Sequence, residues 1–496
     1  MAMSTPTGLV DRTSFSTADI VKDVWTSLYL PPHALSSLSL PGHDAAPAAP
    51  SSFKIGPLAQ SSIALSALSV SLFRGGRISP SPSSPPSVPR VSVPLDHAVA
   101  EFKSERLYTI DNQPPGSPWG SIGGLHKTAD GHVRIHDAFP NHARGTLELL
   151  GLPPDAARRD VAAKVAQWKS VDLETAGTEK GKVAIYALRS YAEWDAHPQS
   201  AAIDDNPVLL EQLAPGPPTN GISSTSTSTS KRCLEGIRVV EMSRVIAAPV
   251  AGKALAAHGA DVLWVTCPNL PDLPALDRDL SRGKRTIQLD LHKPGDKERL
   301  LDLLRTCDVF IQSFRPGSLA AHGLSPRELQ ETNPGIVCAS LSAFGPSGPW
   351  SRRRGYDSLV QTCSGMNVSE AARRGAGEAA RVLPCQALDH AGGYLLATGI
   401  AAALHRRSRL GGSWSVHVSL AGVMKYLRSL GQYPDQTGFE GRDFGTQSDV
   451  PADYLKTRET AFGSMRAVKH SASVEGCEVG WEEMPKPLGS DEARWL

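Results

Sequence analysis

The chain has 496 residues, with 51 lysines and arginines against 50 aspartates and glutamates and a formal net charge of +1. That length allows two or three domains of about 150 residues each. The balanced charge carries no electrostatic signature for nucleic acid or an acidic membrane surface, so we expect neither as a partner. The longest apolar stretches, 63–73 and 391–404, fall short of the about 20 residues that a membrane-spanning helix needs.

All seven cysteines lie between Cys233 and Cys477, and none is in a CxxC pair. A disulfide framework and a zinc ribbon are therefore not expected, and we interpret the thiols as reduced groups of an intracellular protein. The first 16 residues have no apolar core of a secretory signal, and the last three are no peroxisomal signal. We expect a cytoplasmic protein.

Two low-complexity stretches divide the chain. Residues 78–86 are a Pro/Ser run typical of an exposed loop, and residues 215–232 are a Pro/Ser/Thr-rich linker. The chain is therefore divided into an N-terminal region (1–214), a second region (233–430) and a C-terminal return segment (431–496).

Apolar strands and helical patterns alternate after residue 233. Helices are expected at 249–258 and 297–305, and Ser325–Glu328 is a capping box with proline at the first helical position. A long helix after Asp389 is followed by an alternating strand at 414–420. The strands that separate these helices are expected at 237–242, 261–265, 309–311 and 336–341. This order predicts an α/β fold with a doubly wound parallel sheet.

The helix–glycine–strand unit occurs twice. Residues 56–102 resemble residues 387–427 at an offset of 332 positions, with the Pro/Ser run as an insertion in the first copy. The offset places Pro57 opposite Asp389, so the first copy lacks the acid.

The turn after the first predicted strand contains neither GxGxxG nor GxxxxGK[ST], so a nucleotide cofactor of the usual kind is not expected. Arg282, Lys284 and Arg285 form a basic cluster that is either a solvated turn or a clamp for the phosphates of an anionic ligand. The loops 243–248 and 315–317 follow strands, where open α/β sheets bind ligands. The second of these loops is equally consistent with an ordinary strand-to-helix turn.

Asp389 begins a helix whose first turns contain Gly392 and Gly393. It is either an ordinary N-cap or a carboxylate nucleophile beside backbone N–H groups that could stabilise an oxyanion. His126, His132, His136 and His142 have no companion ligands at matched spacing, so no metal site is expected. Cys385 is interpreted as a small buried apolar group.

Six blocks carry a family resemblance in the family's own order. They begin at GIRVVEMSRVIAAP, SRGKRTIQLDL, DVFIQSFRPGSL, NPGIVCASLSAFG, RRGYDSLVQ and ALDHAGGYLLATG. Together, over about residues 234–427, they resemble the class III CoA-transferase (CaiB–BaiF) family. The resemblance implies a Rossmann-like large domain, a smaller α+β domain and an interlocked homodimer. About residues 107–200 resemble the family's small domain, here placed ahead of the large one. This order implies one active site per chain, completed by both halves.

The resemblance also implies a reaction. CoA would move from an acyl-CoA thioester to a free carboxylic acid, with Asp389 as the covalent nucleophile and no tightly bound cofactor. The implied CoA contacts are Val245, Ile246, Ala247, Leu289, Asp290, Leu291, His292, Ser313, Phe314 and Arg315, with Arg282, Lys284 and Arg285 as the candidate clamp. Thr266, Cys267 and Ser313 depart from the family pattern.

Two alternatives stay open from the sequence. The first is a 2-methylacyl-CoA racemase, in which a His–Asp pair stands where this chain has Tyr356 and Asp357. Tyrosine, with an ordinary pKa of about 10, is a poor replacement for an imidazole base. The second is a non-catalytic CoA-binding protein, which the intact Asp389 disfavours.

Overall fold

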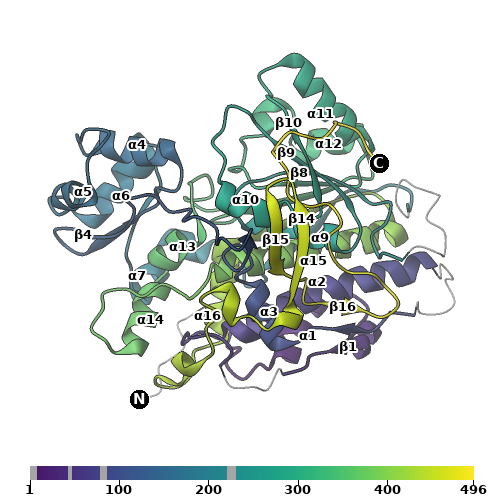
Figure 1. Cartoon of the computed structure of the whole chain (residues 1–496), viewed down its shortest axis with the longest axis horizontal. Coiled ribbons are helices and arrows are strands. Elements are labelled where there is room, and N and C mark those ends of the chain that lie inside the picture. The colour runs from purple at the N-terminus through teal and green to yellow at the C-terminus, as the bar shows by residue number, and fades with distance from the viewer. Residues whose placement is uncertain (1–7, 43–46, 79–86, 220–230) are drawn as a thin grey trace.

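The computed structural model describes residues 8–42, 47–78, 87–219 and 231–496. The Pro/Ser run at 79–86 and most of the 215–232 linker lie outside these ranges. A large α/β body contains the long helices α2 and α15, and a smaller lobe with α4, α5, α6 and β4 projects from one side (Figure 1).

The large body is built on a seven-stranded sheet. Its strands are β7 (Val208–Ala214), β8 (Arg238–Met242), β9 (Asp261–Thr266), β10 (Lys284–Gln288), β11 (Val309–Gln312), β12 (Val337–Ser342) and β13 (Ser413–Ser419). Their order is β10-β9-β8-β11-β12-β13-β7. The strands β8 to β13 pair in parallel, which confirms the predicted parallel α/β sheet.

Strand β7 joins this sheet antiparallel to β13, although it belongs to the N-terminal region. The sequence does not predict this strand, because its residues, VLLEQLA, show no alternation of apolar and polar positions. The two regions of the chain therefore share one sheet.

The strand order reverses between β8 and β11. From β8 the chain moves outward through β9 and β10, and it then returns to β11 on the other side of β8. The loops after β8 and β11 consequently leave in opposite directions and open a crevice at the carboxyl ends of the strands, which is where such sheets bind ligands.

Helices cover both faces of the sheet. The helices α9 (Ala247–Ala257) and α15 (Ala387–Leu410) lie on one face. The helices α11 (Pro294–Thr306) and α12 (Pro326–Thr332) lie on the other face. Each face of the sheet has its own apolar core. Ser325 and Glu328 form the expected capping box at the start of α12. The other helices of this region are α10 (Pro274–Leu280), α13 (Asp357–Cys363), α14 (Met366–Arg374) and α16 (Leu420–Ser429).

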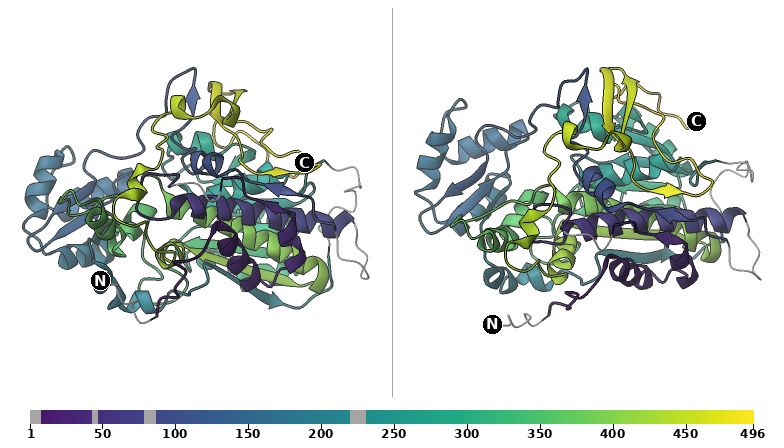
Figure 2. Two further views of the ribbon diagram at one scale, coloured as in Figure 1. Left: turned by 90° about the horizontal axis from the view of Figure 1, so that it is seen from below. Right: turned by 60° about the horizontal axis from the view of Figure 1, so that its bottom comes forward.

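Helix α2 (Ile55–Ile78) packs along α15, and both views in Figure 2 show the pair side by side. Each helix has 24 residues, and their first and last residues stand 332 positions apart, the offset of the predicted repeat. Strand β2 (Val91–Ser92) and helix α3 (Leu95–Glu101) follow α2 as β13 and α16 follow α15.

Helix α2 is longer and more apolar than the sequence analysis expected. By length and hydropathy it fits a membrane span, but 94% of the span is buried inside the protein, as in a core helix. Serines interrupt its apolar run, and the hydroxyls of Ser61, Ser62 and Ser69 donate to backbone carbonyls of the same helix at 2.9–3.2 Å. A serine satisfied in this way can be buried at little cost.

The smaller lobe has an antiparallel sheet of β4 (Gly124–Lys127), β5 (His132–Ile135) and β6 (Ile185–Ala187), with a core of its own. Its helices are α4 (Pro140–Leu149), α5 (Arg158–Val165) and α6 (Ser170–Thr175), and α7 (Tyr191–Asp195) and α8 (Pro198–Ala201) lead back to β7. An α+β unit thus lies within about residues 107–200, the segment that resembles the family's small domain.

The C-terminal segment returns across the N-terminal region. The hairpin β14 (Leu455–Thr460) and β15 (Gly463–Val468) pairs with β3 (Thr109–Ile110). Strand β16 (Ser473–Val474) pairs with β2, whose other neighbour is β1 (Leu38–Ser39). Helix α1 (Thr17–Ser27) packs on α2.

We predict that neither half is stable alone. Expression of residues 231–496 exposes the face of α15 that α2 covers, so the fragment should aggregate or melt without a cooperative transition. Co-expression with residues 1–219 should restore solubility, measured by sedimentation and thermal melting against the full chain. A soluble fragment that melts cooperatively by itself would show this view of the fold to be wrong.

Candidate active site

Three adjoining cavities meet at the switch point of the sheet. Cavity A, of about 260 Å³, lies at the ends of β8, β9 and β10. Cavity C, of about 400 Å³, lies between the loops after β8 and β11 and residues 353–356. Cavity B, of about 370 Å³, lies between α10, the start of α9 and residues 114–119.

Two residues mark where the cavities join. Val245 lines all three cavities, and Asp389 lines both B and C. Val245 has a φ of 69°, in the left-handed region that a β-branched side chain rarely adopts. Such strain costs about 1–3 kcal/mol and concentrates at functional sites.

Asp389 is the third residue of α15 and does not cap it. The carboxylate Oδ2 of Asp357, on α13, accepts the backbone N–H groups of Leu388 and Asp389 at 2.8 and 3.0 Å. The N-cap interpretation of Asp389 is therefore wrong, because Asp357 performs that function from another helix. The Asp389 side chain is 6% exposed, and no described residue donates a hydrogen bond to its carboxylate.

These surroundings make the Asp389 carboxyl difficult to ionise. Burial is the main cause that raises its pKa well above the ordinary value, and the charges of Asp357 and Glu105 add to it. Burial also raises the pKa of Asp357, but two backbone N–H groups stabilise its charge. Asp357 therefore loses its proton first, and Asp389 ionises against that charge.

Aromatic rings and a buried glutamate–histidine contact lie around Asp389. Tyr356 stacks on His136 of the small lobe, with the ring centroids 3.7 Å apart, and burial raises the pKa of Tyr356 to about 12. Glu105 contacts His390 Nε2 at 2.9 Å, and both side chains are buried. Although burial acts to raise the pKa of Glu105, the contact with His390 lowers it to about 2.

The two glycines near Asp389 do not open the helix to substrate. A Cβ atom on Gly393 would lie 2.4 Å from the carbonyl oxygen of Ala247 and 2.6 Å from Cβ of Val250, both on α9. At Gly392 the nearest atom, Leu341 Cδ1, would be 3.5 Å away, an ordinary contact. Gly393 thus serves the close packing of α15 on α9, which corrects the predicted role of an exposed backbone.

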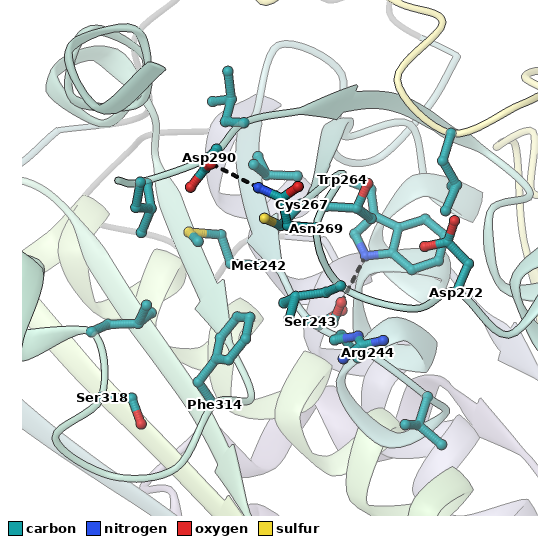
Figure 3. Close-up of a pocket in the computed structure, with 18 of the residues that line it drawn as sticks. Met242, Ser243, Arg244, Trp264, Cys267, Asn269, Asp272, Asp290, Phe314 and Ser318 are labelled. Carbon is teal, nitrogen blue, oxygen red and sulfur yellow. Dashed lines mark hydrogen bonds between the residues drawn. The ribbon is translucent and has the colours of Figure 1, made fainter. Parts of the chain in front are cut away.

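The structure brings ten of the predicted CoA contacts to these cavities. Val245, Ile246, Ala247, Ser313, Phe314 and Arg315 line cavity C, and Leu289, Asp290, Leu291 and His292 line cavity A. Asn269 Nδ2 donates a hydrogen bond to Asp290 at 2.8 Å, the dashed line between these residues in Figure 3, where Phe314 lies below Met242. Thr266 and Cys267, which depart from the family pattern, also line cavity A.

The predicted phosphate clamp does not form, since none of its three cations lines these cavities. Each cation is buried and ends on a carboxylate: Arg282 on Asp279, Lys284 on Glu241 at 2.8 Å, and Arg285 on Asp261 at 2.7 Å. Because a buried cation needs a partner of opposite charge, these side chains hold the fold together and are not available to a ligand.

Other cations, which the sequence analysis did not select, line cavity C. Arg244 and Arg354 do so together with the predicted Arg315, and none of the three forms an ion pair with a carboxylate of the described residues. Arg244 is the second residue after β8, in the loop 243–248 that the sequence already placed at the ligand-binding edge, but its charge was not counted as a signal. Among the described residues, no group of three or more His, Cys, Asp or Glu side chains could hold a metal ion.

Comparison with known proteins identifies the family. A sequence model of CoA-transferase family III matches residues 234–483. A CaiB/baiF CoA-transferase family protein of Caenorhabditis elegans is 34% identical over 48% of this chain and 70% of its own length. The chain belongs to CoA-transferase family III.

Other relatives are matched over part of their length. An acetyl-coenzyme A transferase of Hypoxylon pulicicidum is 27% identical over 70% of this chain and 65% of its own length. An acyl-CoA transferase of Gibberella moniliformis is 30% identical over 60% of this chain and 54% of its own length. The chain thus spans less than two thirds of these two relatives. A crystal structure of a CaiB/BaiF family protein from Brucella suis is 26% identical, with a TM-score of 0.37, over 47% of this chain and 65% of that one.

The two glycines of α15 give a matched pair of variants. Gly393→Ala should destabilise the protein by about 1–3 kcal/mol, because its methyl group overlaps the Ala247 carbonyl oxygen and the Val250 side chain of α9. Gly392→Ala should be neutral or stabilising by up to about 1 kcal/mol, since alanine favours the helix and the space is open. Denaturant unfolding of both variants measures the difference, and equal stabilities would contradict the packing described here.

The pH dependence of Asp389 tests its electrostatic surroundings. Because only the ionised carboxylate can act as a nucleophile, the rate of its reaction with a thioester should rise with pH through the raised pKa of Asp389. Asp357→Asn keeps an oxygen to accept the N–H groups of α15 but removes the charge, so the midpoint should move to lower pH.

The matched control is Glu370→Gln on α14. Burial also raises the pKa of Glu370, but its carboxylate accepts a hydrogen bond from the backbone N–H of Ser52 and lines none of the three cavities. The midpoint of the pH–rate curve of Glu370→Gln should equal that of the unaltered protein. A midpoint that stays in place in Asp357→Asn would refute the coupling of the two aspartates.

Proposed function

We propose that the protein is a CoA-transferase that moves CoA from an acyl-CoA thioester to a free carboxylic acid through a covalent Asp389 intermediate. The observation that carries the proposal is the Asp389 carboxylate itself. It is buried, receives no hydrogen bond from the described residues, and lines cavities B and C, two of the three that meet at the switch point. A nucleophile needs this combination of access from a cavity and freedom from internal partners.

The connected cavities suit a long ligand such as CoA. In this proposal the adenosine end lies in cavity A, and the pantetheine arm passes through cavity C to Asp389. Arg244, Arg315 and Arg354 supply positive charge along that path, as a phosphate-bearing ligand requires. The strained Val245, shared by all three cavities, borders the whole route.

The chemistry proceeds by exchange at two carbonyl groups. The Asp389 carboxylate attacks the thioester carbonyl and expels CoA thiolate, which leaves a mixed anhydride. The thiolate then attacks the Asp389 carbonyl, releases the donor acid and forms an aspartyl-CoA thioester. The acceptor carboxylate attacks this thioester, and the expelled thiolate takes the acceptor's acyl group, restoring the Asp389 carboxylate. Burial limits hydrolysis of these intermediates by water.

The residues at and beside the position of the racemase histidine favour CoA transfer over racemisation. An α-proton transfer needs a base with a pKa near the working pH. Burial raises the pKa of Tyr356 to about 12 and lowers that of His136 to about 3, so neither is a suitable base near neutral pH. A purely CoA-binding protein would have no use for a carboxylate held free at the junction.

The proposal places a whole site within one chain. The small lobe and the N-terminal region contribute His136 and Glu105, and the second region contributes Val245, Tyr356 and Asp389. Homodimerisation and a cytoplasmic location remain expectations, the first from the family and the second from the sequence.

The covalent intermediate provides the test. Incubation with acetyl-CoA and no acceptor should add acyl or CoA mass to the peptide that carries Asp389, and hydroxylamine should remove it. Asp389→Asn should abolish both the adduct and CoA transfer, whereas Glu370→Gln should keep them. Intact-mass and peptide measurements follow the adduct, and circular dichroism checks the fold of each variant.

Two results would overturn the proposed function. One is near-normal transfer by Asp389→Asn. The other is exchange of the α-proton of a 2-methylacyl-CoA for deuterium without transfer of CoA, which would favour the racemase.

A further inference from the structure

Cavity B is an apolar cavity that Asp389 lines, whereas cavity A, also apolar, does not include Asp389 in its walls. Its walls are mainly apolar or aromatic, with buried Ile246, Leu273 and Leu276 on one side. Tyr356 and His136 form a stacked pair, and Trp119 meets the His136 ring edge-on with centroids 5.6 Å apart. Such surfaces bind apolar groups, and aromatic groups in particular.

A proline-rich segment closes the cavity from the N-terminal region. Residues 114–119 read Pro-Pro-Gly-Ser-Pro-Trp, and all of them line cavity B. The three proline rings restrict φ at positions 114, 115 and 118. The Asp137 carboxylate holds the chain just beyond the segment by accepting the N–H groups of Ile122 and Gly123.

The charges in cavity B oppose a second anion. Of the described residues that line it, Arg106 carries the positive charge, and its Nε is already 3.1 Å from Glu105. Asp389 and Glu105 are both acids, and His136, whose pKa burial lowers to about 3, is uncharged near neutral pH. A carboxylate at the far end of a bound acyl group would enter this cavity without a free cation to meet it, which is costly.

We propose that cavity B is the acyl-binding site and that it selects uncharged, bulky or aromatic acyl groups over very small acyl groups and over acyl groups with a second carboxylate. The assignment rests on the proposed function, because it places the thioester carbonyl at Asp389 with CoA in cavity C. Donor and acceptor acids both react at Asp389, so the same walls select both. A cavity of about 370 Å³ would be left mostly empty by a formyl or acetyl group.

The first experiment compares donors by the rate of adduct formation on Asp389. Phenylacetyl-CoA and pentanoyl-CoA should each react at least tenfold faster, in kcat/KM, than acetyl-CoA, since each added methylene in an apolar pocket contributes about tenfold or more. Succinyl-CoA is close to pentanoyl-CoA in size but ends in a carboxylate, and it should react at least tenfold more slowly than pentanoyl-CoA.

Two variants locate the selection in cavity B. Trp119→Ala removes an aromatic wall whose side chain is 47% exposed, so the fold should tolerate it. Ala275→Leu on α10 fills the cavity with a residue that favours helices. Each should lower the ratio of phenylacetyl-CoA to acetyl-CoA reactivity at least fivefold. Val171→Ala on α6 truncates an equally exposed apolar side chain, at 52%, in the same lobe and should leave the ratio unchanged.

The outcomes separate the acyl assignment from the function on which it rests. If succinyl-CoA or acetyl-CoA reacts as fast as pentanoyl-CoA, or if neither variant changes the ratio, the acyl assignment is wrong while the adduct on Asp389 still supports the transferase. If no thioester modifies Asp389, the proposed function fails and the acyl assignment fails with it.

Discussion

The hydrogen bonds from the start of α15 to the Asp357 carboxylate are the interaction on which the site depends. The first N–H groups of any helix need acceptors, and an aspartate in the first turn commonly supplies one itself. Here Asp357 reaches across from α13 to accept Leu388 and Asp389 N–H. The carboxylate of Asp389 is thereby released from the helix and left to face the cavities. The same arrangement places the negative charge of Asp357 beside the Asp389 carboxyl, and this charge raises the pKa of Asp389.

Buried polar contacts from the N-terminal region hold the other side of α15 and the neighbouring helix α10. Glu101 accepts the hydroxyl of Tyr394 at 2.7 Å, Ser104 donates to Asp279 at 2.7 Å, and Glu105 contacts His390 at 2.9 Å. When a buried polar group loses such a partner, the protein loses more folding free energy than the hydrogen bond itself contributes, because the group is left unsatisfied away from water. The end of α3 and the turn after it are therefore matched to the second region of the chain, and this match fixes where Glu105 stands relative to Asp389.

Local sequence patterns predicted the parts of the protein that depend on local physics. The apolar strands, the capping box at Ser325 and the long helix after Asp389 are all set by neighbouring residues, and the structure confirms them. Long-range pairing was not accessible in the same way. Lys284 and Arg285 belong to a basic cluster in sequence, but their partner acids, Glu241 and Asp261, lie on two other strands that only the fold brings near. His136 and Trp119 meet Tyr356 and Asp389 across more than 200 positions of sequence, so no local pattern could link them.

The pairing of α2 with α15 within one chain has a consequence for how the protein can vary. In a symmetric dimer every substitution appears on both sides of the axis, so a change that suits one copy of a helix must also suit the other. Here the two helices are separate stretches of one sequence, with Asp389 in one and Pro57 at the matching place in the other. Each can therefore change without altering its counterpart. Helix α2, which carries no acid, can vary as a packing surface, while only α15 must keep the residues that the proposed reaction needs.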